Sequence, residues 1–206
     1  MIEVQSDGAL CVLTIDRTDK ANSLTADMIE ALCVGVEEAR GSRALILTGR
    51  GKVFSAGADL EAARAGLATS PLWERLSGAI ARHPGLTIAA LNGTAAGGAM
   101  GMVLACDLRI AVPGTKVFYP VMKLGFLPQP SDPARLAALV GPSRAKMILM
   151  AGQKIETDAA LTWGLIDEVV EPDDLMDRAR ALTEDVCGAT AEHTRAIKGL
   201  IAQSLT

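Results

Sequence analysis

The sequence predicts one α/β domain, and three observations support that class. Short apolar runs typical of buried strands alternate along the chain with segments whose apolar residues recur at helical spacing. Such alternation favours a parallel or mixed sheet covered by helices. The 206 residues suffice for one domain with a sizeable core. Half of them are apolar but only 3% are aromatic, so we expect a core of Ala, Leu, Val and Ile, with Met filling gaps.

The first half of the chain should contain a hairpin, helices and further strands. Ile2–Gln5 and Ala9–Ile15 flank Ser6-Asp7-Gly8, which is a hairpin pattern. An amphipathic helix follows a cap at Ser23 or Thr25, because apolar residues then recur at i, i+3, i+4 and i+7. The expected elements are the helix Ala26–Arg40, the strand Ala44–Thr48, the helices Leu60–Gly66 and Leu72–Arg82, and the strand Thr87–Leu91.

The stretch Leu91–Ala111, LNGTAAGGAMGMVLACDLRIA, has the clearest chemical meaning. A strand ends at a turn, and the pair Gly97-Gly98 then leads into a predicted helix over Ala99–Cys106, followed by a strand over Leu108–Val112. Two glycines at a helix start let a ligand approach the backbone and direct free N–H groups at it. If the ligand is a carbonyl that becomes an enolate, such a site is an oxyanion hole.

The second half is more irregular. We expect a short strand at Val117-Phe118 and then a loop-rich segment that contains four prolines, residues 119–133. The remaining elements are predicted as the helices Pro133–Val140, Ser143–Ala151 and Thr157–Trp163, the strand Leu165–Val170, and the helices Pro172–Val186 and Ala191–Ser204.

Charge and composition exclude several classes of function. The net charge of −4 argues against nucleic-acid binding, which requires a basic face. No apolar run approaches the ~20 residues of a membrane span, and the N-terminus lacks the order of a signal peptide, so we expect a cytoplasmic protein. The four cysteines are scattered without CxxC spacing, which favours reduced thiols. His83 and His193 are too far apart in sequence to suggest a metal cluster, so no metal is expected.

A second motif makes the interpretation more specific. Val53–Leu60 reads VFSAGADL and follows a predicted strand and a glycine turn. Together with the Gly-Gly stretch, and with KANSLT, KLGFLP and AALTWGLIDEVV in the same order, it resembles the enoyl-CoA hydratase/isomerase, or crotonase, superfamily. The resemblance implies one crotonase-like domain over residues 1–206: a ClpP/crotonase spiral core of ββα-type units with a C-terminal helical region from about residue 143. Family members usually continue further, so it also implies a shortened C-terminus.

The resemblance also implies partners and a binding site. The substrate would be an acyl-CoA of fatty acid metabolism, with coenzyme A as part of the substrate and no separate cofactor, and the protein would be a homo-oligomer, with a trimer favoured. Matched by position, the backbone N–H groups of Ala58 and Gly98 would form the oxyanion hole. Further substrate-binding positions would be Lys20, Ala21, Ser23, Ser55, Ala56, Asp59, Leu60, Gly97, Val121 and Leu124. Lys20 is equally well explained as a solvated lysine, and Asp59 as the cap of a helix start.

Two glutamates that the family's hydratases use are missing. Gly101 and Val121 stand at the matching positions. Hydration needs one carboxylate to activate water and a second acid–base group to protonate the α-carbon, and neither residue can do this. We therefore expect that the protein is not an ordinary hydratase. An isomerase, a decarboxylase or a thioester hydrolase is favoured.

Two other residues are candidates for acid–base chemistry. Asp132 lies in a loop region where a dehalogenase branch of the family carries its aspartate, although an N-cap at Ser131 or Asp132 before Pro133 explains it better. Tyr119 precedes the missing glutamate position, and some decarboxylating relatives use a tyrosine near the thioester; packing is its simpler role.

The function expected from the sequence is therefore acyl-CoA thioester processing through an enolate held in an oxyanion hole. The alternatives are a non-catalytic acyl-CoA-binding homologue and a purely structural subunit. The intact VFSAGADL and Gly-Gly segments argue against the structural subunit.

Overall fold

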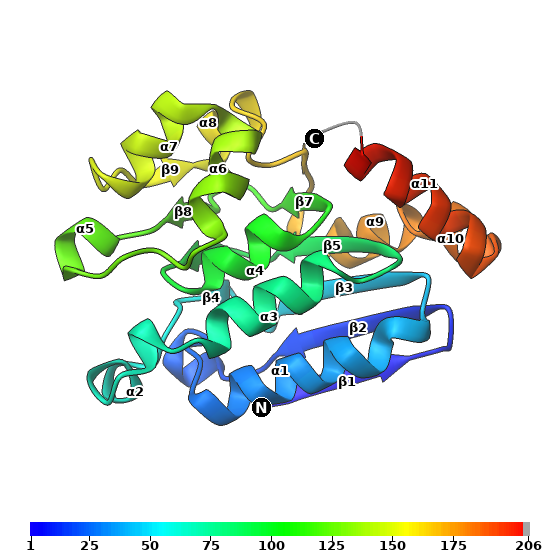
Figure 1. Cartoon of the computed structure of the whole chain (residues 1–206), viewed down its shortest axis with the longest axis horizontal. Coiled ribbons are helices and arrows are strands. Elements are labelled where there is room, and N and C mark those ends of the chain that lie inside the picture. Colours follow the sequence, from blue (N-terminus) through cyan, green and yellow to red (C-terminus); the bar gives the residue numbers. More distant parts are fainter. Residues whose placement is uncertain (204–206) are drawn as a thin grey trace.

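Two sheets form the frame of the molecule (Figure 1). The structure is a computed structural model that describes residues 1–203. The first sheet has six strands in the order β1-β2-β3-β5-β7-β10. Only β1 and β2 pair antiparallel in it, which confirms the mixed sheet expected from the sequence. Its strands are β1 (Ile2–Ser6), β2 (Leu10–Ile15), β3 (Ala44–Gly49), β5 (Leu86–Leu91), β7 (Leu108–Ala111) and β10 (Glu168–Val169).

The second, four-stranded sheet positions the candidate site. Its order is β4-β6-β8-β9, and β4, β6 and β8 run parallel. The carboxyl ends of parallel strands meet at one edge of a sheet, so the loops after these strands, which begin at Ala56, Gly97 and Tyr119, lie together. The sequence predicted β8 but neither β4 nor β6 as strands. The strands are β4 (Val53–Ser55), β6 (Thr94–Ala96), β8 (Lys116–Phe118) and β9 (Ile155–Glu156).

Helices cover both faces of the large sheet. In β3, Leu45 and Leu47 belong to the main apolar core, whereas Ala44 and Ile46 face a second cluster that includes residues of α9 (Leu175–Ala181). This division follows from the alternation of side chains along a strand. On the main side lie α1 (Ala26–Glu38), α3 (Leu72–Ala81) and α4 (Ala99–Ala105).

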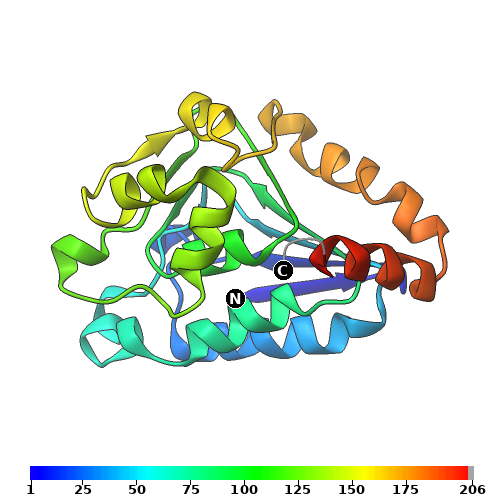
Figure 2. The same ribbon diagram turned by 45° about the horizontal axis from the view of Figure 1, so that its top comes forward.

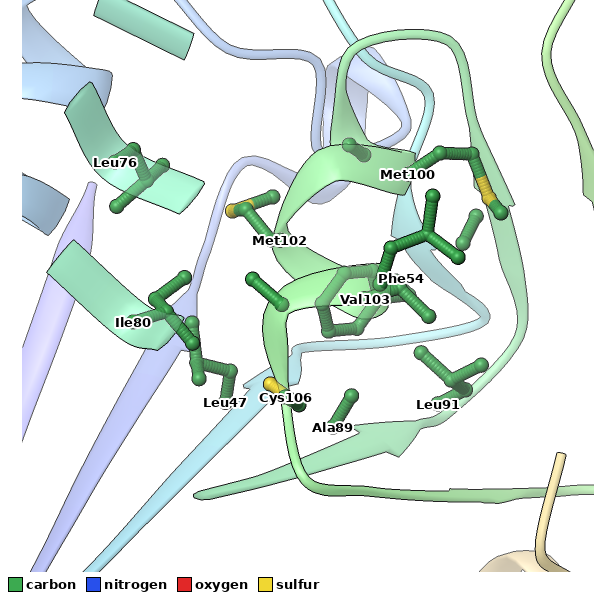
Figure 3. Packing of buried hydrophobic residues seen from close by; sticks show 14 of the residues in the cluster. Leu47, Phe54, Leu76, Ile80, Ala89, Leu91, Met100, Met102, Val103 and Cys106 are labelled. Atoms are coloured by element: carbon green, nitrogen blue, oxygen red, sulfur yellow. The ribbon is translucent and has the colours of Figure 1, made fainter. Parts of the chain in front are cut away.

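Helix α4 is completely buried. Figure 3 shows Met102 and Val103 of this helix among Leu76 and Ile80 of α3 and Leu91 of β5. A helix that is apolar on every side has no solvent-facing stripe and must be enclosed by its neighbours. The core around α4 therefore holds its N-terminus, with Gly97 and Gly98, in a fixed place.

Of the remaining helices, four lie at the two ends of the molecule, and α6, α7 and α8 lie along the top of Figure 1. Figures 1 and 2 place α2 and α5 at one end, and α10 and α11 at the other. No helix within residues 1–203 has the length and apolarity needed to cross a bilayer. These helices are α2 (Leu60–Arg64), α5 (Val121–Leu124), α6 (Asp132–Val140), α7 (Pro142–Leu149), α8 (Thr157–Thr162), α10 (Glu184–Gly188) and α11 (Ala191–Gln203).

Several predicted boundaries differ from the structure. Of the two predicted caps, Ser23 and Thr25, it is Thr25 that caps α1, by accepting from the Met28 N–H at 3.3 Å. The prediction of a single helix over Pro172–Val186 is wrong, because this segment is divided into a 3-10 turn, α9 and α10. Between α9 and α10 the Thr183 hydroxyl donates to the Arg180 carbonyl at 2.7 Å. The strand predicted over Leu165–Val170 is confined to β10, because the N–H groups of residues 165 and 166 bond to the end of α8 instead. The predicted C-terminal residue of the last helix, Ser204, lies outside the described residues.

Candidate functional site

A cleft of about 580 Å³ opens at the edge where the loops after β4, β6 and β8 meet. Its volume is typical of sites for small molecules and cofactors, and most of its lining is apolar. Nine of the residues predicted for the site line it: Ala21, Ala56, Ala58, Leu60, Gly97, Gly98, Tyr119, Val121 and Leu124. The predicted residues Lys20, Ser23, Ser55, Asp59 and Asp132 do not.

The loop after β4 leaves one backbone N–H group unused. The N–H of Ala56 donates to the Ala21 carbonyl at 3.0 Å, and the N–H of Asp59 donates to the Leu24 carbonyl at 2.9 Å. Gly57 donates to the Ser55 hydroxyl at 3.2 Å. Within residues 1–203 the N–H of Ala58 has no hydrogen-bond acceptor. The loop is thus fixed on both sides of a donor that remains available at the cleft.

The loop after β6 leaves a second donor next to the first. Gly97 (φ +57°) donates to the Phe118 carbonyl at 3.1 Å, whereas the N–H of Gly98 has no acceptor among the described residues. A Cβ on Gly57 (φ +88°) would lie 3.2 Å from the Gly98 nitrogen, so the two loops are in direct contact. Only glycine allows both this φ and this approach. Two unpaired N–H groups therefore lie on adjacent loops of one cleft.

Gly98 is required for a further reason. A Cβ at this position would lie 2.8 Å from the nearest atom of the Trp73 indole ring. Trp73 comes from α3, is 2% exposed and is held by a hydrogen bond from Nε1 to the Leu67 carbonyl at 2.9 Å. The aromatic ring thus packs directly against the backbone of the second donor.

Several polar residues predicted for the site support the loops. The buried Ser55 hydroxyl donates to the Asn22 carbonyl at 2.8 Å. The Asn22 side chain, also buried and with a left-handed backbone (φ +53°), bonds to Arg17 N–H and to the carbonyls of Arg50 and Val53. Ser23 is 9% exposed and contacts Arg17. These residues fix the loop that carries Ala56 and Ala58.

Two other predicted residues lie outside the cleft. Asp59 caps α2 by accepting from Glu61 and Ala62 N–H at 3.0 and 3.2 Å, which confirms its structural interpretation. These hydrogen bonds, the one from Ala62 above all, together with Arg17 at 2.9 Å lower the pKa of Asp59. Lys20 is exposed at the end of a 3-10 turn, Thr18–Lys20.

The two positions that lack glutamate differ in environment. Val121 begins α5 and lines the cleft. Gly101 is buried in α4, and a Cβ built on it would lie 3.2 Å from both carboxylate oxygens of Asp132. The Asp132 carboxylate therefore lies against the space that a side chain at position 101 would need.

Of the two predicted N-cap positions, Ser131 is the N-cap residue of α6, although its side chain makes no capping hydrogen bond, and the side chain of Asp132 does not cap the helix. Asp132 is the first residue of α6, is 0% exposed, and accepts from the Tyr119 hydroxyl at 3.0 Å through Oδ2. Its Oδ1 has no hydrogen-bond partner within residues 1–203. Glu74 of α3 instead receives hydrogen bonds from the Ser131 hydroxyl and, at 3.2 Å, from the Ser131 N–H. With the carboxylate of Glu74 at this helix start, the Asp132 side chain is free to turn inward.

Burial controls the protonation of this pair. It raises the pKa of Asp132 to about 6, an increase that the Tyr119 hydrogen bond and the charge of Arg135 oppose. Arg135 Nη1 lies 3.8 Å from Oδ1 and is itself buried without a hydrogen-bond partner in the described chain. Burial and the nearby Asp132 charge also raise the pKa of Tyr119. A buried carboxyl group with a pKa near neutrality is typical of acid–base sites.

The described part of the chain contains no cluster of metal-ligating side chains and no disulfide. Within residues 1–203, no three His, Cys, Asp or Glu side chains are grouped to hold a metal ion. The four cysteines are free thiols, and burial raises the pKa of Cys106 to about 12. His83 is buried and its ring bonds to the backbone at Ala39 and Gly85.

Some residues that line the cleft were not among the predicted site residues. Trp73 comes from a distant helix, and Phe126 and Leu127 come from the segment predicted as a loop. The sequence offered one sign for the last two, namely large apolar residues inside a segment predicted as a loop; in the structure Leu127 is 86% exposed, and the predicted site residue Leu60 is 75% exposed. Large apolar side chains in an exposed loop are consistent with ligand binding.

Comparisons with known proteins show the family of this chain. The family model described as enoyl-CoA hydratase/isomerase matches residues 5–206. A short-chain-enoyl-CoA hydratase from Clostridium acetobutylicum is 33% identical over 196 residues, which cover 89% of this chain and 74% of that protein. A carnitinyl-CoA dehydratase from Salmonella enteritidis is 33% identical over 210 residues, which cover 96% of this chain and 78% of that protein.

Solved structures give the same result. The crystal structure of an enoyl-CoA hydratase from Bacillus anthracis matches with a TM-score of 0.91 at 29% identity, covering 99% of this chain and 83% of that one. The likeness confirms the expected crotonase-like fold. The chain belongs to the enoyl-CoA hydratase/isomerase family.

Proposed function

We propose that this protein binds acyl-CoA thioesters, stabilises the thioester enolate through the N–H groups of Ala58 and Gly98, and uses that enolate to move a double bond rather than to add water. The observation that carries the proposal is the pair of unpaired backbone donors on adjacent loops of one apolar cleft. Preorganised donors of this kind stabilise negative charge that develops on a carbonyl oxygen, and each is commonly worth about 10²–10³-fold in rate.

The lining of the cleft argues against hydration. Among its described residues, the only ionisable side chains are Arg64 and Tyr119, so no carboxylate lines the cleft to activate water. Thioester hydrolysis meets the same difficulty. Migration of a double bond needs only one proton-transfer site, because the proton that leaves one carbon can return to another.

The lining of the cleft best fits an acyl group with an apolar chain. The rim residues Leu60, Phe126 and Leu127 offer apolar surface, and Arg64, the one cationic residue of the lining, is exposed. A carboxylated acyl group, as a decarboxylase would require, would find no buried cation in the described lining. We therefore expect 3-enoyl thioesters to be converted to their conjugated 2-enoyl isomers, with coenzyme A as part of the substrate.

The experiment combines turnover with binding. The protein is incubated with 3-octenoyl-CoA and 2-octenoyl-CoA; isomerisation is followed by the absorbance of the conjugated thioester, and hydration or hydrolysis by product mass. Isomerisation of the 3-enoyl thioester without any hydrated or hydrolysed product supports the proposal. Rapid hydration of the 2-enoyl thioester contradicts it. Tight binding without any turnover contradicts it too, and favours the non-catalytic acyl-CoA-binding alternative.

A pair of variants tests the donors. Ala58→Pro removes an N–H that has no acceptor within residues 1–203, so no hydrogen bond of the described structure is lost, whereas Ala58→Gly keeps the donor and is the matched control. Calorimetry with octanoyl-CoA should show strong loss of binding for the proline variant only. Equal binding by both variants would remove Ala58 from the oxyanion hole.

A further inference from the structure

We propose that Tyr119 is the proton-transferring side chain of the cleft and that Asp132, reaching it from α6, is the group with which the proton is exchanged, in place of a carboxylate on α4. The inference rests on the proposed function, because it names the residues that move the proton at the enolate. Tyr119 would be the catalytic residue, since it lines the cleft. Asp132 would act through it.

A continuous path joins the cleft to Asp132. Gln129 and Tyr119 both line the cleft, and the Gln129 N–H donates to the Tyr119 hydroxyl at 3.4 Å. The same hydroxyl donates to Asp132 Oδ2 at 3.0 Å. The Tyr119 oxygen is therefore held on one side by the backbone of a cleft residue and on the other by a fully buried carboxylate, and the hydrogen bond to Asp132 is the one along which a proton can pass.

Gly101 makes room for this arrangement. Because a Cβ at this position would lie 3.2 Å from both Asp132 oxygens, a longer acidic side chain there would compete with Asp132 for space and charge. Gly101 also follows Gly98 by three helical residues, a rise of about 4.5 Å. The carboxylate thus lies about one helical turn from the proposed oxyanion-hole donor Gly98.

The surroundings of Asp132 allow its carboxyl group to gain or lose a proton near neutral pH. Its Oδ1 is completely buried and unpartnered in the described structure. The charged groups that act on it are Arg135 on its own helix, which favours the carboxylate, and Glu74 of α3, which disfavours it. Helix α4 carries no ionisable side chain. Burial outweighs Arg135, and the pKa of Asp132 rises to about 6.

The proton transfer balances without any other reactant. The α-carbon–hydrogen bond breaks and its proton passes to the Tyr119 oxygen, while the hydroxyl proton of Tyr119 passes to Asp132 Oδ2. The electron pair of the broken bond enters the enolate, whose oxygen is held by Ala58 and Gly98. Return of the proton along the same path to the γ-carbon completes the isomerisation and restores both side chains. A concerted relay avoids a free tyrosinate, which burial beside Asp132 disfavours.

The first experiment measures exchange of the α-protons of octanoyl-CoA in D₂O by mass, with calorimetric binding in parallel. Tyr119→Phe and Asp132→Asn should each lower exchange by about 10²-fold or more, while binding stays within a few-fold of wild type. Asp177→Asn, which removes the same charge from an exposed position on α9, is the matched control and should exchange normally. Exchange by Asp132→Asn at the wild-type rate would overturn the inference and leave the proposed function intact. Absence of wild-type binding would instead refute the proposed function.

The second experiment measures how the rate of wild-type exchange depends on pH. If Asp132 had a purely structural role, its titration would not change this rate. Exchange should rise with pH through about 6 and then level off, because the relay needs the carboxylate. Arg135→Met should move this rise to higher pH, and Glu74→Gln, which keeps an acceptor for Ser131, should move it to lower pH. Shifts in the same direction, or a profile without this rise, would contradict the assignment.

Discussion

Replacing Asp132 with asparagine should stabilise the folded protein at neutral and alkaline pH. The fold raises the pKa of this carboxyl from 3.8 to about 6, mainly through burial. A raised pKa in an acid means that the charged form is less stable in the folded than in the unfolded state. The favourable contribution of the neutral carboxyl group to the free energy of unfolding is therefore fully present below about pH 4, and it is lost as the pH rises through about 6.

The size of the effect follows from the same two values. A difference of about two pKa units corresponds to roughly 3 kcal/mol over the whole range, of which about 1–2 kcal/mol falls between pH 5 and pH 8. The amide side chain of the variant cannot ionise, so Asp132→Asn should gain this amount relative to wild type between those two pH values. The comparison of two pH values removes any constant effect of the amide.

Urea unfolding of both proteins at pH 5 and pH 8 measures this difference directly. The free energy of unfolding of the variant, relative to wild type, should rise by about 1–2 kcal/mol from the lower to the higher pH. The exposed substitution Asp177→Asn should show no such rise. If Asp132→Asn had the same effect at both pH values, the carboxyl would not be a buried acid of raised pKa, and its proposed part in proton transfer would lose its support. Together with lost exchange activity, a stabilised variant would indicate a residue retained for function at a cost in stability.

Three further predictions concern the glycines and the assembly. Gly98→Ala should destabilise by about 1–3 kcal/mol, because its Cβ would overlap the Trp73 ring at 2.8 Å; Gly199→Ala, which meets no atom within 4 Å, should not, and equal melting temperatures would refute this. Wild-type hydration of crotonyl-CoA should stay far below ~10 s⁻¹, and Gly101→Glu with Val121→Glu should restore some of it only together with Asp132→Ala, which frees the space; full activity of wild type would contradict the argument. Sedimentation should give a trimer, and a stable monomer would exclude that assembly.

Local patterns in the sequence were sufficient for the class of fold and for the Gly-Gly loop, whereas the loop that carries Ala58 was expected from the resemblance to the family. The apolar spacing of α1 and the Thr25 cap are local properties, and both are confirmed. The pair Gly97-Gly98 at a predicted helix start indicated a backbone that a ligand can approach. The strands β4 and β6 were missed, because each has only three residues and lies inside a glycine-containing motif that was interpreted as a loop or turn, whereas β8, which is equally short, lies outside those motifs and was predicted.

The tertiary structure alone decided what Asp132 does. In the sequence, an aspartate before a proline has the pattern of a helix cap, and that pattern describes only the neighbouring residues. In the folded chain, Glu74 from α3 receives the hydrogen bonds of Ser131 at this helix start, and the missing side chain of Gly101 leaves space beside α4. The Asp132 carboxylate therefore turns inward to Tyr119. Contacts between three separate segments decide this orientation, and no local pattern contains them.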